Sequence, residues 1–167
     1  MKIVIINGPN LNLLGKREPS IYGTKSMEQV LVDIQRAYPD VHFEYRQSNH
    51  EGDLIDWLQE VGASCACLEA RGERQEVKGI VLNAGGYTHT SVALRDAVAC
   101  SKVPVVEVHI SDITKREEFR RISLLTDVCA HSIIGHGTEG YKEAVEWILE
   151  RVESRGRDKR VEIRDKR

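Results

Sequence analysis

Two segments of the sequence carry residue types that can move protons. In the first, residues 3–23, an apolar run of strand type ends in Asn-Gly-Pro-Asn and continues into a polar loop with Arg17 and Tyr22. A free tyrosine has a pKa of about 10, so it acts as a base near neutral pH only where a cation lowers that value. Arg17 can supply this charge from the same loop. Tyr22 is therefore a candidate base, with a packing tyrosine beside a solvated arginine as the alternative on spacing alone.

The second segment, VEVHIS, contains Glu107, His109 and Ser111. Side chains alternate between the two faces of a β-strand, so Glu107 and His109 leave the strand on the same face. A carboxylate in that position can orient an imidazole and fix its tautomer. This pairing favours a general acid at a cleft over a histidine that is buried only for packing.

Alternating strand and helix patterns define the elements that must position these residues. The expected strands are the first apolar run and residues 41–45, 79–82, 103–110 and 128–134. The expected helices begin at residues 26, 52, 92, 116 and 141, and those at 116 and 141 extend to 124 and 152. The first helix has a Ser-x-x-Gln capping box and ends before Pro39. Largely apolar strands that alternate with helices predict a doubly wound α/β fold, a five-stranded parallel sheet covered on both faces.

In such folds ligands bind beyond the carboxyl ends of the strands. Three expected strand ends carry polar residues, which are Asn10, Arg17, Tyr22, Asn83, His89, Glu107, His109 and Ser111. We expect these side chains to surround a single site.

Length and composition restrict the class of protein. A chain of 167 residues with 41% hydrophobic content suits one well-buried domain, expected at residues 1–150. Its apolar runs are short and interrupted by charge, so no membrane segment is predicted, and the absence of a signal peptide favours a cytoplasmic protein. The four cysteines lack CxxC spacing, which argues against a structural zinc or thioredoxin-like site.

The charge is distributed unevenly between the body and a C-terminal tail. Residues 151–167 carry eight Lys/Arg and four Asp/Glu, so the tail has a charge of +4 and the body a charge of −6. A negative body does not favour nucleic acid, and no nucleic-acid partner is expected. The interleaved charges of the tail indicate either disorder or a solvated extension of the last helix.

Four motifs give the chain a clear resemblance to the type II 3-dehydroquinate dehydratases. They are NGPNLNLLGKREPSIYG, RQSNHEG, LNAGGYTHTSVALRDA and VPVVEVHISDITKREEFRR, and the resemblance extends from residue 3 to about residue 149. It implies a flavodoxin-like fold and the dehydration of 3-dehydroquinate to 3-dehydroshikimate with no metal or organic cofactor. It also implies a homododecamer built as a tetramer of trimers.

The resemblance implies roles for the residues that could do chemistry. Tyr22 would remove a proton from carbon 2, next to the ketone, with Arg17 lowering the pKa of the tyrosine. Asn10 would help to hold a water that stabilises the resulting enolate. His109, oriented by Glu107, would then protonate the departing carbon-1 hydroxyl.

Further residues are implied to hold the substrate. Those implied to bind its carboxylate are Asn83 and, through their backbone, Ile110 and Ser111. Those implied to meet its ring hydroxyls are His89, Arg120 and, from a neighbouring subunit, Asp96. On the helix expected at 116–124, Arg116 and Arg120 stand four apart and share a face, so both can point at one polar ligand.

Two regions depart from the family pattern, a longer insertion around residues 64–77 and the basic tail. Neither contains a motif residue, so they bear on the surface and assembly more than on the chemistry. The loop with Arg17 and Tyr22 is expected to act as a lid, with Gly15 and Gly23 as flexing points.

Other functions agree with parts of the sequence. A serine hydrolase could use Ser111 beside His109, but no G-x-S-x-G elbow is present. Residues 135–140, GHGTEG, match a dinucleotide fingerprint, yet a tight turn before the last helix explains them better because too little chain follows for a second strand and an acidic ribose ligand. The non-enzymatic alternative is a binding module that holds an anion without converting it.

Overall fold

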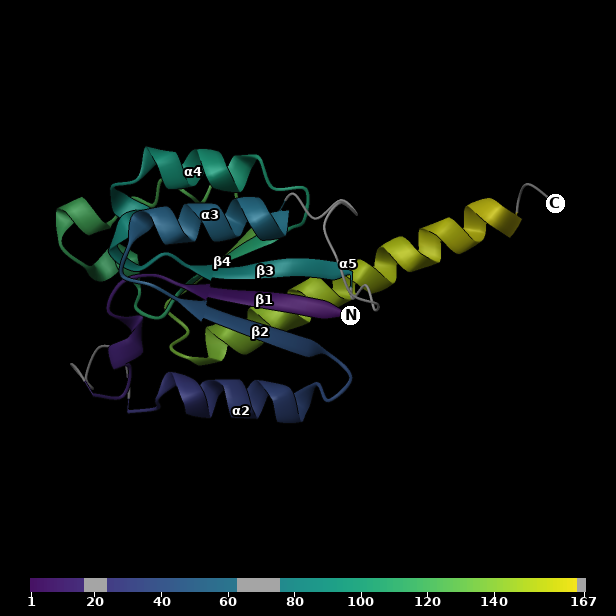
Figure 1. The fold of residues 1–167 in the computed structure, drawn as a ribbon, viewed down its shortest axis with the longest axis horizontal. Helices are drawn as coiled ribbons and strands as arrows, with labels where there is room; N and C mark the ends of the chain where they lie inside the picture. Colours follow the sequence, from purple (N-terminus) through teal and green to yellow (C-terminus); the bar gives the residue numbers. More distant parts are fainter. Residues whose placement is uncertain (17–23, 63–75, 165–167) are drawn as a thin grey trace.

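The computed structural model describes residues 1–16, 24–62 and 76–164, with side chains described as far as residue 154 (Figure 1). Its strands are β1 (Lys2–Asn7), β2 (His42–Gln47), β3 (Val77–Asn83), β4 (Val105–His109) and β5 (His131–Ile134). They form a parallel sheet in the order β2-β1-β3-β4-β5. This is the flavodoxin-like order, so the predicted doubly wound α/β fold is confirmed.

Helices cover both faces of the sheet (Figure 1). They are α2 (Met27–Ala37), α3 (Glu51–Gly62), α4 (Val92–Ala99) and α5 (Glu139–Arg164). In β1, Ile3 and Ile5 pack with the α2 and α5 side, whereas Val4 and Ile6 pack with the α3 and α4 side. Because alternate residues of the strand face opposite apolar layers, every residue of β1 after Lys2 is buried, as its continuous apolar sequence predicts.

The start of α2 confirms the predicted capping box. The Ser26 side chain accepts a hydrogen bond from the Gln29 backbone N–H, and the Gln29 side chain accepts one from the Ser26 backbone N–H at 2.9 Å. These two bonds satisfy backbone donors that a helix start otherwise leaves without partners. The helix ends at Ala37, two residues before Pro39.

The prediction of a helix over residues 116–124 is wrong. The chain forms two 3-10 turns instead, η3 (Ile113–Lys115) and η4 (Glu118–Arg120). After them, the Ser123 side chain accepts hydrogen bonds from the backbone N–H groups of Leu125 and Thr126. Arg116 and Glu117 have extended backbone angles, with ψ of −176° and 149°, which interrupt a helix at its expected start, and the Leu124 N–H donates to the Thr88 carbonyl instead of to a preceding turn.

The C-terminal elements also differ from their expected bounds. The last strand starts at His131 instead of residue 128, because Val128 and Cys129 both donate to the Leu125 carbonyl in a turn. The last helix continues to Arg164, so the tail extends this helix, one of the two alternatives that its sequence left open. In Figure 1 this end of α5 projects well beyond the sheet.

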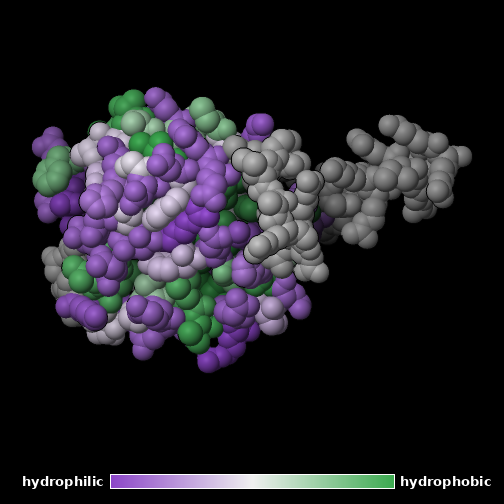
Figure 2. Space-filling view, viewed as in Figure 1, coloured by the Kyte–Doolittle hydropathy of each residue, from purple (hydrophilic) through white to green (hydrophobic). Residues whose placement is uncertain are grey.

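The described surface is mostly hydrophilic in the view of Figure 2, with hydrophobic residues in separate patches. The most exposed large hydrophobic side chains include Phe119 and Ile122, each 69% exposed, which flank Arg120. In the part of the chain that the structure describes, no helix is both long and apolar enough to cross a bilayer.

Candidate active site

A cleft with a volume of about 340 Å³ opens where β1, β3 and β4 end. Seven of the predicted site residues line it, namely Asn10, Asn83, His89, His109, Ile110, Ser111 and Arg120. The cleft lies beside β1 and β3, where the strand order reverses and where open α/β sheets commonly bind ligands. The fold therefore brings together residues from segments that are far apart in the sequence.

The other four predicted residues are placed differently. Glu107 is fully buried behind His109 and does not line the cleft. Asp96 is exposed on α4, away from the lining of the cleft, so its action from a neighbouring subunit stays a prediction. Arg17 and Tyr22, the expected lid and most of the expected insertion lie outside the described residues.

The predicted pairing of Glu107 with His109 on one strand face is confirmed. The Nε2 atom of His109 lies 2.7 Å from the Oε1 atom of Glu107, and both side chains are almost completely buried. The ring N–H does not point along this short contact, so Nε2 has no well-aligned hydrogen bond among the described residues. The short contact nevertheless places the Glu107 carboxylate directly against the ring.

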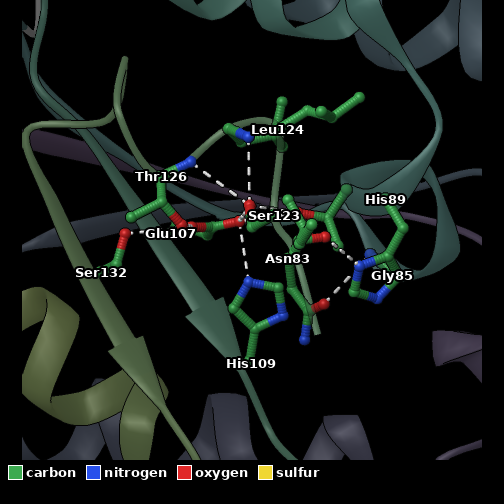
Figure 3. Close-up of polar contacts among 12 residues, drawn as sticks. Asn83, Gly85, His89, Glu107, His109, Ser123, Leu124, Thr126 and Ser132 are labelled. Carbon is green, nitrogen blue, oxygen red and sulfur yellow. Dashed lines mark hydrogen bonds and ion pairs between the residues drawn. The ribbon is translucent and has the colours of Figure 1, made fainter. Parts of the chain in front are cut away.

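The Glu107 carboxylate accepts hydrogen bonds from four hydroxyl groups, which we call the hydroxyl network (Figure 3). The donors to Oε1 are Thr88 at 2.7 Å and Ser123 at 2.6 Å, and the donors to Oε2 are Thr126 at 2.8 Å and Ser132 at 3.0 Å. Burial alone would raise the pKa of Glu107, but His109 and the hydroxyls lower it to about 2. Glu107 is therefore ionised at neutral pH despite its burial.

A second network, the tyrosine network, holds Asn83 from behind the cleft. The Asn83 Nδ2 atom donates to the Tyr141 hydroxyl, and that hydroxyl donates to the Oδ1 atom of Asn7, both at 2.9 Å. The Asn83 Oδ1 atom accepts from the Gly85 backbone N–H at 3.2 Å. Since an amide nitrogen has two hydrogens, one Nδ2–H of Asn83 is not used by these contacts and can serve a ligand.

Sequence reasoning did not identify Tyr141 or Asn7. Both are fully buried, and burial raises the pKa of Tyr141, so it remains a neutral phenol. The available signal was weak, because Asn7 ends an apolar strand and Tyr141 lies in the apolar stripe of the last helix, where an aromatic residue is usually a packing residue. Only the folded chain reveals that their polar groups meet.

Asn10 has an unusual backbone conformation at the mouth of the cleft. Its φ of 67° is the one positive value at a non-glycine residue in the described ranges, and asparagine tolerates this region better than most residues. Its backbone N–H donates to the Oδ1 atom of Asn49 at 2.9 Å, and the Asn49 carbonyl accepts from the Tyr87 hydroxyl. Asn49, from the RQSNHEG motif just after β2, therefore supports a cleft residue that follows the neighbouring strand β1.

Arg116 and Arg120 both line the cleft although no helix connects them. Arg116 donates to the Ser111 hydroxyl at 3.2 Å, and both arginines approach one oxygen of Glu117, at 3.3 and 3.4 Å. The buried Nε of Arg120 has no well-aligned hydrogen bond among the described residues. Two guanidinium groups therefore lie together at this side of the cleft, which suits an anionic or polyhydroxyl ligand.

His89 contributes a neutral ring to the cleft. Burial lowers its pKa, and the charges of His109 and Arg120 lower it further, although the bond to the Ile122 carbonyl opposes this. Its Nδ1 atom lies 2.7 Å from the Ile122 carbonyl oxygen, which can only accept, so Nδ1 carries the hydrogen. The neutral ring then presents Nε2 as an acceptor for a ligand hydroxyl.

The GHGTEG segment forms the tight turn predicted before α5. The backbone N–H groups of Gly135 and Gly137 donate to the carbonyls of His109 and Ile110, at 2.9 and 3.0 Å. Both glycines have positive φ values. These two amides fasten the turn to the end of β4 and so cannot cradle a phosphate group.

Comparisons with known proteins identify relatives of the chain. A family model described as Dehydroquinase class II matches residues 1–149. The chain is 45% identical over 150 residues to a 3-dehydroquinate dehydratase of Halothermothrix orenii, which covers 89% of this chain and 93% of that protein. It is 48% identical over 145 residues to 3-dehydroquinate dehydratase 1 of Agrobacterium fabrum, covering 86% and 92%. The crystal structure of a type II dehydroquinase from Butyrivibrio crossotus superposes with a TM-score of 0.78 at 43% identity, covering 89% and 97%.

Proposed function

The chain belongs to the class II dehydroquinase family, whose reaction is the dehydration of 3-dehydroquinate, and we propose that it performs this elimination with His109 as general acid and Tyr22 as base. The base takes the proton from carbon 2, and the carbon 1–oxygen bond breaks as the acid supplies a proton to the leaving hydroxyl. The products are the conjugated enone 3-dehydroshikimate and water. The observation that carries the proposal is the buried pair of Glu107 and His109 at the end of β4.

The acid step is supported by the electrostatics of this pair. Glu107 is held ionised 2.7 Å from the Nε2 atom of His109, so the imidazole has a fixed carboxylate behind it while its other edge is available to the cleft, an arrangement that suits a general acid. Because His109 lines the cleft and Glu107 does not, the imidazole delivers the proton and the carboxylate orients it.

Substrate binding is supported by the polar groups that line the cleft. The carboxylate is assigned to the unused Nδ2–H of Asn83 and to the backbone N–H groups of Ile110 and Ser111. The ring hydroxyls are assigned to Nε2 of His89, as an acceptor, and to the guanidinium of Arg120. Each assignment pairs a donor with an acceptor, as a buried polar ligand requires.

The base step is supported by the sequence and by the position of β1. Tyr22 and Arg17 follow the strand whose end borders the cleft, and Asn10 lies between them and that strand. Arg17 would lower the pKa of Tyr22 so that the tyrosinate removes the proton. A water held partly by Asn10 would stabilise the enolate, and closure of this loop as a lid would exclude bulk water.

The assembly is also part of the proposal. Asp96 is exposed on α4, where it is free to reach a neighbouring subunit's site, as the predicted tetramer of trimers requires. An exposed aspartate is fully solvated, so its position alone does not require a partner. The sedimentation of the protein at several concentrations checks for the twelve-subunit species.

An assay on 3-dehydroquinate tests the function directly. The appearance of ultraviolet absorbance from the conjugated enone is expected, whereas binding without any absorbance change would support the non-enzymatic binding module. Substrate labelled stereospecifically at carbon 2 should lose the hydrogen that lies anti to the leaving hydroxyl. Loss of the syn hydrogen, together with a lysine imine trapped by borohydride, would contradict the tyrosinate mechanism.

A further inference from the structure

The segment that carries the cleft arginines has little regular structure. We call residues 116–126 the arginine arm. Only Glu118–Arg120 form a turn of 3-10 helix within it, and the remainder has neither helical nor strand pairing. A loop of this kind normally varies in position, because few backbone hydrogen bonds fix it. The position of Arg120 must therefore depend on contacts beyond the arm.

Those contacts come from the end of η2 (Gly85–His89), from Glu107 and from Arg95 of α4, whose guanidinium donates to the Leu124 carbonyl. The Leu124 backbone N–H donates to the Thr88 carbonyl at 2.8 Å, and the Ile122 carbonyl accepts from His89. The side-chain contacts to the buried carboxylate are those of Ser123 to Oε1 and Thr126 to Oε2. Figure 3 shows Ser123 and Thr126 turned inward toward Glu107 from the arm, and Ser132 turned toward it from β5.

We propose that Ser123 and Thr126 are positioning residues that fix Arg120 in the cleft by binding the arginine arm to Glu107. One buried carboxylate then serves two parts of the site, the acid His109 and the arm that carries Arg120. The inference rests on the proposed contact of Arg120 with the substrate.

The chemistry of the contacts explains why they can hold an irregular segment. Hydrogen bonds to an ionised carboxylate are shorter and stronger than those between neutral groups. Glu107 is itself rigid, because it is fully buried in the middle of the parallel strand β4. A hydroxyl of the arm that binds this fixed charge takes its position from the sheet.

The arm also has a feature that makes its position matter. Arg120 lines the cleft, and its buried Nε lies 3.4 Å from Oε2 of Glu117 within the arm, so the guanidinium is held at one end and moves with the arm. A guanidinium binds through donors in a fixed planar arrangement, and a displacement of about 1 Å weakens such contacts strongly. Loosening the arm should therefore weaken substrate binding through Arg120.

A matched pair of variants tests this inference. Thr126 and Ser132 each donate one hydrogen bond to the same oxygen, Oε2 of Glu107, at 2.8 and 3.0 Å, but only Thr126 belongs to the arm. Thr126→Val and Ser132→Ala should change kcat and its pH profile by similar amounts, because both remove one donor from the carboxylate. Thr126→Val alone should raise KM for 3-dehydroquinate, by about tenfold, and Thr126→Ser should restore it.

A double-mutant cycle shows whether the effect passes through Arg120. In an Arg120→Ala background, Thr126→Val should cause no further rise in KM, because the guanidinium that it positions is already absent. Circular dichroism and urea unfolding of every variant verify that each is folded.

The results distinguish a failure of the positioning role of Thr126 from a failure of the proposed contact between Arg120 and the substrate. If Thr126→Val and Ser132→Ala raise KM equally, or if the Thr126 and Arg120 effects multiply, the inference is overturned while the role of Arg120 stands. If Arg120→Ala leaves KM unchanged, the proposed contact with the substrate fails and the inference fails with it.

Discussion

The two networks behind the cleft join different kinds of structural element, regular strands and a helix in one and mainly irregular segments in the other. The tyrosine network joins Asn7, Asn83 and Tyr141, which lie on β1, β3 and α5, and all of its groups are neutral. The hydroxyl network surrounds a charge, and only Glu107 and Ser132 among its members lie on strands.

This difference separates two tasks. Regular elements already have fixed positions, so a neutral network between them can set the orientation of an amide without large electrostatic forces. Irregular segments have no such support, and an ionised carboxylate provides stronger hydrogen bonds to hold them. The charged network also supplies the field that the acid His109 needs. We therefore expect the hydroxyl network to govern the chemistry at His109 and, through the arginine arm, the contact of Arg120 with the substrate. We expect the tyrosine network to govern the contact that Asn83 makes with the substrate.

The largest expected effect is the removal of the acid itself. His109→Ala should lower kcat by about 1,000-fold, the usual scale for loss of a general acid, while KM changes much less. The enone absorbance assay measures both constants. An added small acid such as imidazole should restore part of the rate, and a variant with nearly normal kcat would remove His109 from the mechanism.

The next effect concerns stability at low pH. Folding lowers the pKa of Glu107 from 4.5 to about 2, so its contribution is complete above about pH 4.5 and is lost as the pH falls toward 2. The shift corresponds to about 3 kcal/mol of unfolding free energy. Urea unfolding between pH 2 and pH 6 should show this loss in the wild type.

Glu107→Gln should reduce that pH dependence, since its side chain does not titrate. The tyrosine network should show the opposite sign. Burial raises the pKa of Tyr141, so its neutral phenol stabilises the fold below about pH 10 and this contribution is lost as the pH rises further. Equal acid sensitivity in the wild type and in Glu107→Gln would contradict the account of the charged network.

A smaller effect is expected from Tyr141→Phe. The change removes one hydroxyl, so the Nδ2 atom of Asn83 and the side-chain Oδ1 atom of Asn7 each lose one hydrogen bond. The unfolding free energy should therefore fall by about 2 kcal/mol. KM should rise by about tenfold with a smaller change in kcat, because the substrate-facing amide is no longer held.

Tyr38→Phe is the matched control for this variant. The Tyr38 hydroxyl donates to Glu146 in an exposed contact away from the cleft. Its loss should leave KM unchanged, so a similar rise in KM in both variants would show that the Tyr141 effect is not specific to Asn83.

The smallest effect is expected at Asn49. Asn49→Ala removes the acceptor for the Asn10 backbone N–H in an exposed contact, so stability should fall by less than about 1 kcal/mol. The rate should fall by a few-fold at most, measured as kcat/KM, because Asn10 keeps its place at the end of β1. A loss as large as that of His109→Ala would mean that Asn49 itself contacts the substrate.

The sequence is a good guide wherever the relevant contacts are local. The period of two placed Glu107 beside His109, and Ser26 with Gln29 marked the start of α2, because both patterns involve residues within a few positions of each other. The sheet class followed from apolar strands that alternate with helices.

The sequence is a poor guide to the hydroxyl and tyrosine networks, because their contacts are distant along the chain. Ser123 belongs to a stretch whose composition favours a helix, and nothing local shows that its hydroxyl binds a carboxylate sixteen positions earlier. Tyr141 and Asn7 are 134 positions apart and meet only when α5 packs on the sheet. Tertiary contacts of this kind override local propensity.

The projecting end of α5 has a practical consequence for handling the protein. The helix runs from the cleft end of the sheet toward the opposite end and beyond it, and its 26 residues span about 39 Å. A purification tag, fluorescent label or surface linker attached at the C-terminus would therefore sit at the end of a spacer directed away from the cleft. Immobilisation through this end should leave the site accessible, whereas an attachment at Lys16, two residues after the cleft-lining Leu14, should not.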